Sequence, residues 1–241
     1  MSSAASLASH YGLRAAKAWR IQPDKVLTFL NLVMENNPRK PLEDILVRPD
    51  VQLALTQPFS DAASQTVDLM DSAWKAGSKI GSEEASKMLK DLGLEGVQKG
   101  KASVSTLNSL KADVWKNSAS AKDRLIEAMQ GDREGLSDRL GKVTRDLQRR
   151  ATIGIDVAVK EAYSQSAMAT YAQNGAAGKT WHSHIDEKTC SHCQGLDGIT
   201  VAVGETFPEY TGTRVLGTYG PLLGPPRHPS CRCWLTPSLM V

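Results

Sequence analysis

Four cysteines and one histidine near the C-terminus combine the residue types and the spacing of a metal site. Cys190 and Cys193 form a Cys-x-x-Cys pair, and the run His228-Pro-Ser-Cys231-Arg-Cys233 follows a long Gly- and Pro-rich excursion. A Cys-x-x-Cys turn lets two thiolates converge on one tetrahedral cation at about 2.3 Å, because turn amides fold back toward the sulfurs. His228 and Cys231 have the same three-residue offset. The spacing predicts one structural zinc ion that joins two distant loops.

The fourth ligand has two candidates. The first set is Cys190, Cys193, His228 and Cys231. If residues 231–235 are extended, Cys231 and Cys233 point the same way, so Cys233 can take the place of His228. Four reduced thiols without metal, or a disulfide, are the alternatives, and the ligand spacing favours zinc. A closed set of four ligands leaves no position for a substrate water, so we expect a structural site and not a catalytic one.

Other polar residues near the cysteines have simpler interpretations. His182 and His184 share one face of a predicted strand, where a solvent-facing pair is favoured over a second metal site. His192 lies inside the Cys-x-x-Cys turn and is expected to be an exposed spacer. Asp197 precedes Gly198 and indicates a turn. The chain has no convincing nucleophile with a partnered base, carboxylate pair or phosphate-binding loop, so we predict that it is not an enzyme.

The chain around the cysteines predicts a small α+β module. From about residue 175 the sequence is rich in Gly, Pro, Thr and aromatic residues, and residues 179–185 and 199–203 alternate with the period of a strand. The preceding chain, from Ser2 to about Gln173, is helical in pattern nearly throughout. The predicted fold class is therefore mainly α, with a long helical N-terminal region followed by a small α+β zinc-knuckle-like C-terminal module.

Glycines and a change in composition divide the chain into three predicted regions. An N-terminal helical region covers residues 1–93, a central helical hairpin or bundle covers 101–174, and the Cys/His-rich module covers 175–241. Glycines at 93, 96 and 100 mark the first connection.

Apolar periodicity places helices within these regions. Prolines at 41 and 49 predict that residues 38–58 hold only short helices. Ser120, with Asp123 three residues later, predicts the start of a new helix that Gly131 ends. A core-facing stripe is predicted at Ala62, Thr66, Met70, Ala73, Gly77 and Ile80.

A helix-pairing seam is predicted in the second half of the helical sequence. Its apolar residues are Leu136, Leu140, Val143 and Leu147. The seam continues with small residues at Ala151, Gly154, Ala158, Ala162 and Ala169. Small side chains allow a neighbouring backbone to approach closely along this stretch.

Composition argues against several classes of protein. The chain has 241 residues, is 41% hydrophobic and carries a formal charge of +3, which is typical of a globular protein and too weak to imply nucleic-acid binding by itself. No uncharged apolar run approaches the roughly 20 residues of a membrane span, and the N-terminus has no apolar signal-peptide core. We therefore expect a protein that starts in the cytosol and has no membrane span.

The C-terminal motifs together resemble those of a known family. Residues 186–193 read Asp-Glu-Lys-Thr-Cys-Ser-His-Cys, residues 196–198 read Leu-Asp-Gly, and residues 225–233 read Pro-Pro-Arg-His-Pro-Ser-Cys-Arg-Cys. This ordered series resembles the signature of the Mu-F-like family of phage head-morphogenesis, or minor capsid, proteins. The resemblance covers the last quarter of the chain.

This resemblance implies a minor head protein of a tailed phage. Such a protein would associate with the portal protein or the major capsid protein, and act in head assembly or DNA delivery. It would be found in the host cytoplasm during assembly and then in the virion, at the head or neck. The family's presumed metal or structural cluster maps onto Cys190, Cys193, His228, Cys231 and Cys233.

Two other functions are carried as alternatives. One is a zinc-dependent nuclease of the HNH kind, in which His228 would activate water, although Arg227 stands where an acid is expected. The other is a non-catalytic DNA-binding protein, since DNA binding occurs in some family members. Packaged DNA would then contact the basic stretch of Lys142, Arg145, Arg149 and Arg150, for which interleaved acids favour a solvated helix face.

Overall fold

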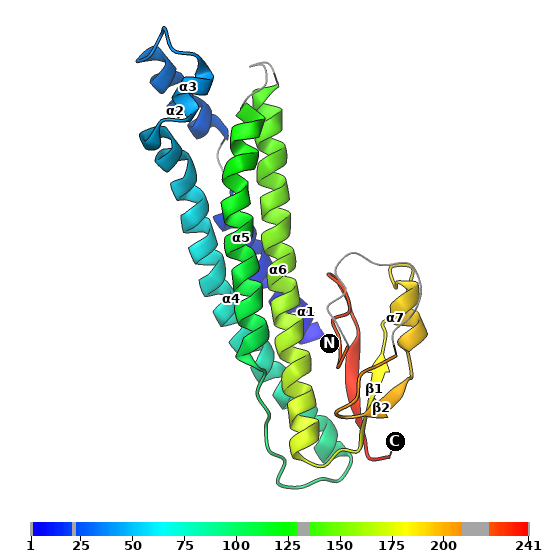
Figure 1. Ribbon diagram of the computed structural model, residues 1–241. Coiled ribbons are helices and arrows are strands. Elements are labelled where there is room, and N and C mark those ends of the chain that lie inside the picture. The colour runs from blue at the N-terminus through cyan, green and yellow to red at the C-terminus, as the bar shows by residue number, and fades with distance from the viewer. Residues whose placement is uncertain (1, 21–22, 130–134, 209–221, 241) are drawn as a thin grey trace. The chain divides into compact units, whose positions relative to one another are not determined.

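The computed structural model describes residues 2–20, 23–129, 135–208 and 222–240. Its helices dominate and its strands are confined to the C-terminal part (Figure 1). The predicted fold class, mainly α with a small C-terminal α+β module, is confirmed. The elements in order are α1 (Ser2–Ala18), α2 (Pro23–Glu35), α3 (Leu42–Leu46), α4 (Pro49–Asp91), α5 (Val104–Met129), α6 (Leu136–Gln173), β1 (Gly178–His182), α7 (Ser191–Leu196), β2 (Thr200–Ala202) and β3 (Trp234–Ser238).

The chain forms two compact units, and the long helices α4, α5 and α6 contribute to both. We call the unit that contains the cysteines the site unit; it consists of Met1–Tyr11, Met70–Asn108 and Ile153–Val241. The other unit, Gly12–Leu69 with Ser109–Thr152, we call the helical unit. The three-region division drawn from the sequence stays a prediction, which limited proteolysis can test.

Two predicted helix boundaries are wrong, and both corrections come from burial. Residues 38–58 do not hold only short helices, because α4 starts with Pro49 as its first residue and continues through Pro58. An internal proline costs about 3 kcal/mol. Leu55 and Phe59, which flank Pro58, are both buried in the helical unit, and burial of two such side chains stabilises by about 3–6 kcal/mol. Burial therefore outweighs the broken hydrogen bond.

The second wrong boundary is the helix start at Ser120. The helix α5 runs without a break from Val104 to Met129, and Gly131 lies outside the described residues. Val114, Ala121 and Leu125 are buried on both sides of the predicted start. A continuous helix keeps these side chains in one core-facing row.

Close contact between the backbones of α4 and α6 confirms the predicted small-residue seam in the site unit. A Cβ atom placed on Gly77 would lie 2.6 Å from the carbonyl oxygen of Val159, and one on Gly81 would lie 2.2 Å from that of Tyr163. Real Cβ atoms do not come so close to another atom. Glycine at these two positions is what allows the helices to meet. In the helical unit the predicted seam residues Leu136, Leu140, Val143 and Leu147 are buried, as expected.

The C-terminal strands form one antiparallel sheet in the order β2-β1-β3, with β1 in the centre (Figure 1). Trp181 of β1 and Leu235 of β3 pair directly and are buried. The hydroxyl of Tyr171, near the end of α6, donates a 3.1 Å hydrogen bond to the carbonyl of Leu235. The core beneath the sheet comprises Ala85, Leu89, Ala167, Tyr171, Ala176, Trp181, Cys193, Leu196, Phe207, Cys231 and Leu235. Two of the cysteines are therefore part of this core.

Lys179 of β1 is fully buried in the module and leads to a prediction about alkaline stability. Its Nζ donates a 2.8 Å hydrogen bond to the carbonyl of Val203 and lies 5.5 Å from the centroid of the Phe207 ring. Burial lowers the pKa of Lys179 to about 8. Between pH 8 and about 10.5 the unfolded chain therefore binds more protons than the folded one, so this lysine makes stability rise with pH.

We expect Lys179→Met to remove that rise. The free energy of unfolding of the wild type, relative to the variant, should increase by up to about 1 kcal/mol per pH unit above pH 8. Urea denaturation at pH 7.5, 8.5 and 9.5 measures the difference. Parallel pH profiles for the two proteins would show that Lys179 keeps its ordinary pKa.

Candidate metal centre

The first pair of candidate ligands is placed by the short helix α7. Cys190 is the N-cap residue, in extended conformation, and its sulfur accepts a 3.4 Å hydrogen bond from the backbone N–H of Cys193. The backbone N–H groups in the first turn of a helix have no partner within the helix, and an N-cap residue normally accepts from one of them through a side-chain oxygen. Here the sulfur of Cys190 takes that role. Cys193, in the first turn of α7, is buried. The local backbone therefore aims both sulfurs to the same side, as the Cys-x-x-Cys spacing predicts.

The second group of candidate ligands lies in the segment that leads into β3. The backbone N–H of Cys231 donates a 3.1 Å hydrogen bond to the carbonyl of His228, which closes a tight turn. Ser230 within this turn has a φ of 65°, a left-handed conformation that is unfavourable for a residue with a Cβ. Its backbone N–H donates a 3.1 Å hydrogen bond to the carboxylate of Asp156 on α6. The helix thus holds the turn in place.

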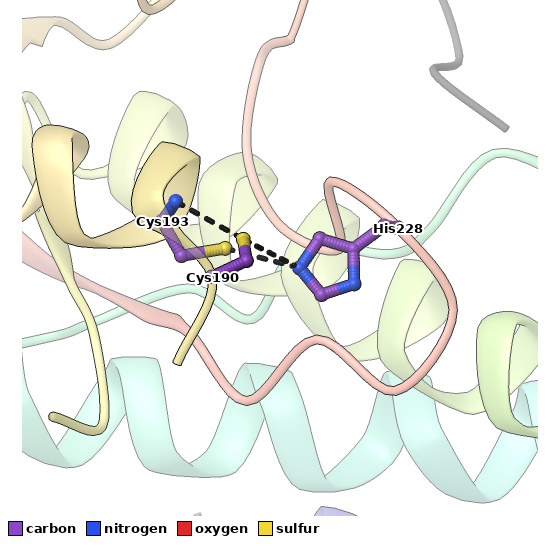
Figure 2. Close-up of side chains that lie close together, drawn as sticks. All are labelled: Cys190, Cys193 and His228. Carbon is purple, nitrogen blue, oxygen red and sulfur yellow. Dashed lines mark hydrogen bonds between the residues drawn. The ribbon is translucent and has the colours of Figure 1, made fainter. Parts of the chain in front are cut away.

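The imidazole of His228 has its metal-binding nitrogen directed at the first pair. Nδ1 lies 2.7 Å from the carbonyl oxygen of Pro229. A carbonyl can only accept a hydrogen bond, so Nδ1 carries the proton and Nε2 has a free lone pair. Nε2 lies 3.2 Å from the sulfur of Cys190 and 3.3 Å from that of Cys193 (Figure 2). A carbonyl partner on the far nitrogen is the usual arrangement for a metal-bound histidine.

The separations between these atoms fit a tetrahedral zinc shell. With Zn–S bonds of about 2.3 Å, tetrahedral geometry places two sulfurs about 3.8 Å apart and a sulfur and a nitrogen about 3.5 Å apart. The sulfurs of Cys193 and Cys231 lie 3.9 Å apart, and the two sulfur–nitrogen distances to His228 are 3.2 and 3.3 Å. These three pairs have the separations of a tetrahedral shell, but the four donors of neither predicted set all lie within 4.8 Å of one another.

All of the predicted ligands come together, in two overlapping groups. Cys190, Cys193 and His228 form one group, and Cys193, Cys231 and Cys233 form the other; within each group the donor atoms lie within 4.8 Å of one another. Either group could hold a metal ion. Cys193 is common to both, which makes it the central donor. A cavity of about 20 Å³, enough for one water-sized sphere, is lined by Cys190, Cys193, His228 and Cys233 among others.

Proton sharing among the sulfurs follows from their proximity. The pKa of Cys231 is lowered, because the thiols of Cys193 and Cys233 donate hydrogen bonds to its thiolate. For the reciprocal reason the pKa of Cys193 is raised. A cation at this place would take over the role of those protons, since zinc binds the deprotonated form of each thiol.

A buried serine that the sequence interpretation overlooked supports the cysteines. The hydroxyl of Ser183 donates a 2.6 Å hydrogen bond to the carbonyl of Cys193 and accepts one of 3.2 Å from the indole N–H of Trp181. The same oxygen lies 3.3 Å from the sulfur of Cys233. The backbone N–H of Ser183 donates a 2.7 Å hydrogen bond to the carboxylate of Asp197. Asp197 therefore does more than form a turn, because it fixes the residue that touches both cysteine loops.

An ion pair also joins the two cysteine loops. The carboxylate of Asp186, which precedes Cys190, accepts hydrogen bonds from both terminal nitrogens of Arg232, between Cys231 and Cys233. Hydrogen bonding to Arg232 holds the pKa of Asp186 well below its usual range. Asp186 also accepts a 2.9 Å hydrogen bond from the backbone N–H of Lys188. The sequence shows both residues inside the motifs but not their pairing, which depends on the fold.

The other histidines do not form a second metal group among the described residues. His182 stacks on Trp234, and its Nε2 lies 2.8 Å from the hydroxyl of Thr236. The side chain of His184 is 56% exposed, 3.7 Å from the carboxylate of Asp186. The expectation that His192 is an exposed spacer is wrong, because His192 is buried in α7. The first turn of α7 buries both His192 and Cys193.

The predicted basic stretch lies exposed on α6 in the helical unit. Lys142, Arg145, Arg149 and Arg150 are all exposed. Asp146 accepts hydrogen bonds from Arg150 at 2.8 Å and pairs with Arg124 of α5 at 2.6 Å. Part of the positive charge is therefore neutralised within the unit.

Comparison with known proteins gives one finding that bears on function. The model of a family described as Phage Mu protein F like protein matches residues 87–236. Comparisons with curated proteins and with solved structures find no match. Among the described residues, no helix has the length and apolar character needed to cross a membrane. The family match includes every candidate ligand.

Proposed function

The chain belongs to the phage Mu protein F-like family, a family of phage head morphogenesis, and from this premise we propose that it is a minor head protein that binds the portal during head assembly. The family match over more than half of the chain is the observation that carries the proposal. In this role the protein is made in the host cytoplasm and then enters the virion, at the head or neck. The major capsid protein is the second partner that the role allows.

We infer that the cysteine cluster serves this role as a rigid staple and not as a reactive centre. Cys190, Cys193, His228 and Cys231 would hold one zinc ion, with Cys233 as the alternative ligand. Zinc would supply a cross-link between α7 and the segment before β3, at the core to which Cys193 and Cys231 belong. The ion pair between Asp186 and Arg232 supports the same junction. With four protein ligands, zinc has no site for a substrate water.

Co-purification tests the proposed partner. The tagged chain should retain the portal protein of the same phage when the two are produced together, and should be found in purified mature particles by mass spectrometry. The matched control is the Cys193→Ser variant, which should lose portal binding if the module makes the contact. A chain that stays free of both portal and particles would contradict the proposal.

DNA contact is a second candidate that the exposed basic stretch favours. Asp146 forms its ion pairs with Arg124 and Arg150. The exposed side chains of Lys142, Arg145 and Arg149 take no part in these pairs and can contact phosphates. Binding of duplex DNA should then weaken with salt, with a slope of log affinity against log salt of about −0.9 per phosphate contacted. Replacement of these three residues by alanine should remove that slope.

The nuclease alternative has less support from the geometry. His228 would have to activate water beside a divalent ion, but its Nε2 lies next to two sulfurs and its Nδ1 faces a backbone carbonyl. Plasmid cleavage that survives purification and disappears in His228→Ala would restore this alternative.

A further inference from the structure

A second cavity in the site unit lies apart from the cysteine cluster and has a volume of about 470 Å³. Glu161 and Gln165 of α6 line it, together with Ser103 and Thr106 at the start of α5. Apolar contacts come from Met168 and from the segment of Leu222, Leu223 and Pro225. Its size is in the range of sites that bind small molecules or a short stretch of peptide.

A hydrogen-bonded Gln165 side chain contacts one oxygen of the Glu161 carboxylate. The amide nitrogen of Gln165 donates to Oε2 of Glu161 at 3.1 Å and to the hydroxyl of Thr106 at 3.0 Å. The amide oxygen of Gln165 accepts a 3.1 Å hydrogen bond from the backbone N–H of Ser103. Both ends of the Gln165 amide are therefore engaged, so its orientation is determined. One oxygen of Glu161, Oε1, receives no hydrogen bond from any described residue.

The charge of Glu161 is not balanced within the described part of the chain. Burial raises the pKa of Glu161 to about 7, against the opposing effect of the hydrogen bond from Gln165. No described cation forms an ion pair with this carboxylate, and the neighbouring Lys160 is bound to Asp156 at 2.8 Å. Lys101 is the other charged side chain among the described lining residues, and it is exposed. A positive group placed beside Glu161 would offset the cost of its burial.

We propose that this cavity binds the guanidinium of an arginine side chain that a protein partner presents, with Glu161 as its counter-ion. A guanidinium can donate to Oε1 of Glu161 in its plane, while Met168, Leu223 and Pro225 contact the aliphatic stem. An anion would be repelled by Glu161. A divalent metal ion would need several oxygen ligands, and among the described lining residues Glu161 alone has a carboxylate. The inference goes beyond the proposed function, because it assigns a second binding site and its ligand. It holds whichever partner protein supplies the arginine.

Calorimetric titration of the full-length protein at pH 8 tests the proposal with N-acetyl-arginine amide as the probe. The neutral isostere N-acetyl-citrulline amide should bind at least tenfold more weakly, because a charge-assisted hydrogen bond is lost. Glu161→Gln should weaken the arginine probe at least tenfold and leave the citrulline probe unchanged. The matched control is Glu127→Gln, an exposed carboxylate on α5, which should bind the arginine probe as the wild type does.

A spectroscopic readout separates binding at Glu161 from binding elsewhere. Saturating arginine probe should move the carboxyl ¹³C titration of Glu161 from about pH 7 to a lower pH. Equal affinities for the arginine and citrulline probes would overturn the proposal. So would equally tight binding of spermidine through Glu161, which would assign the cavity to a polyamine.

Discussion

The substitution Cys193→Ser should abolish metal binding and unfold the C-terminal module. Cys193 is the one donor common to both candidate ligand groups, and its side chain is also part of the core under the sheet. Structural zinc sites in small peptides contribute about 10–16 kcal/mol of apparent binding free energy at pH 7, more than a small core can replace. Backbone amide signals of β1, α7, β2 and β3 should collapse to unfolded positions, while those of α5 remain dispersed.

Two matched variants make this result specific to the metal. Cys233→Ser should retain one zinc ion if His228 completes the set, and should lose it if Cys233 does. Ser183→Ala removes hydrogen bonds to both cysteine loops without removing a donor atom, so it should weaken the module and keep the ion. If Cys193→Ser keeps a dispersed module of unchanged stability, the staple is not what holds these loops.

A second large effect is expected from Gly81→Ala in α4. The new Cβ would lie 2.2 Å from the backbone oxygen of Tyr163 and 2.5 Å from the hydroxyl of Ser166, so α6 must move away. Overpacking of this kind costs about 1–3 kcal/mol. We expect the upper end of that range, because the closest atom belongs to the helix backbone and cannot rotate aside. Urea denaturation followed by circular dichroism measures the loss.

Gly154→Ala, in α6 of the same unit, provides the matched control. Its new Cβ would meet only the end of the Met70 side chain, at 3.5 Å. Alanine is favoured over glycine within a helix by about 1 kcal/mol, so this variant should be as stable as the wild type or more stable. Equal stability changes in the two variants would show that α4 and α6 do not meet at Gly81.

The ligands could be predicted from the sequence because their geometry is largely local. Cys190 and Cys193 are three residues apart, and one turn of α7 is enough to bring the second amide onto the first sulfur. His228 and Cys231 are joined by a similar tight turn. The choice of a fourth ligand could not be predicted, because it depends on how the two turns meet in three dimensions.

The errors in the helical region have one physical cause. Pro58 disfavours a helix interior, and Ser120 favours the start of a helix. Each of these local preferences is worth a few kcal/mol at most. Burial of Leu55 and Phe59 in one case, and of Ala121 and Leu125 in the other, outweighs them. Such long-range contacts leave no mark within a short window of sequence.

The supporting residues were missed for a related reason. Ser183 resembles any strand serine until the fold brings Cys193 and Cys233 to its hydroxyl. The pairing of Asp186 with Arg232 likewise connects two motifs that lie far apart in the chain. The signal available in the sequence was only that both residues lie inside the motifs.

X-ray absorption at the zinc edge, together with metal analysis of the reduced full-length protein, tests the central claim most directly. We predict one zinc ion per chain with a first shell of three sulfurs at about 2.3 Å and one nitrogen at about 2.0 Å. A shell of four sulfurs would replace His228 by Cys233 and leave the staple intact. Less than about half an equivalent of zinc, with all four thiols free and unmodified, would contradict the claim that a shared ion ties the two loops together.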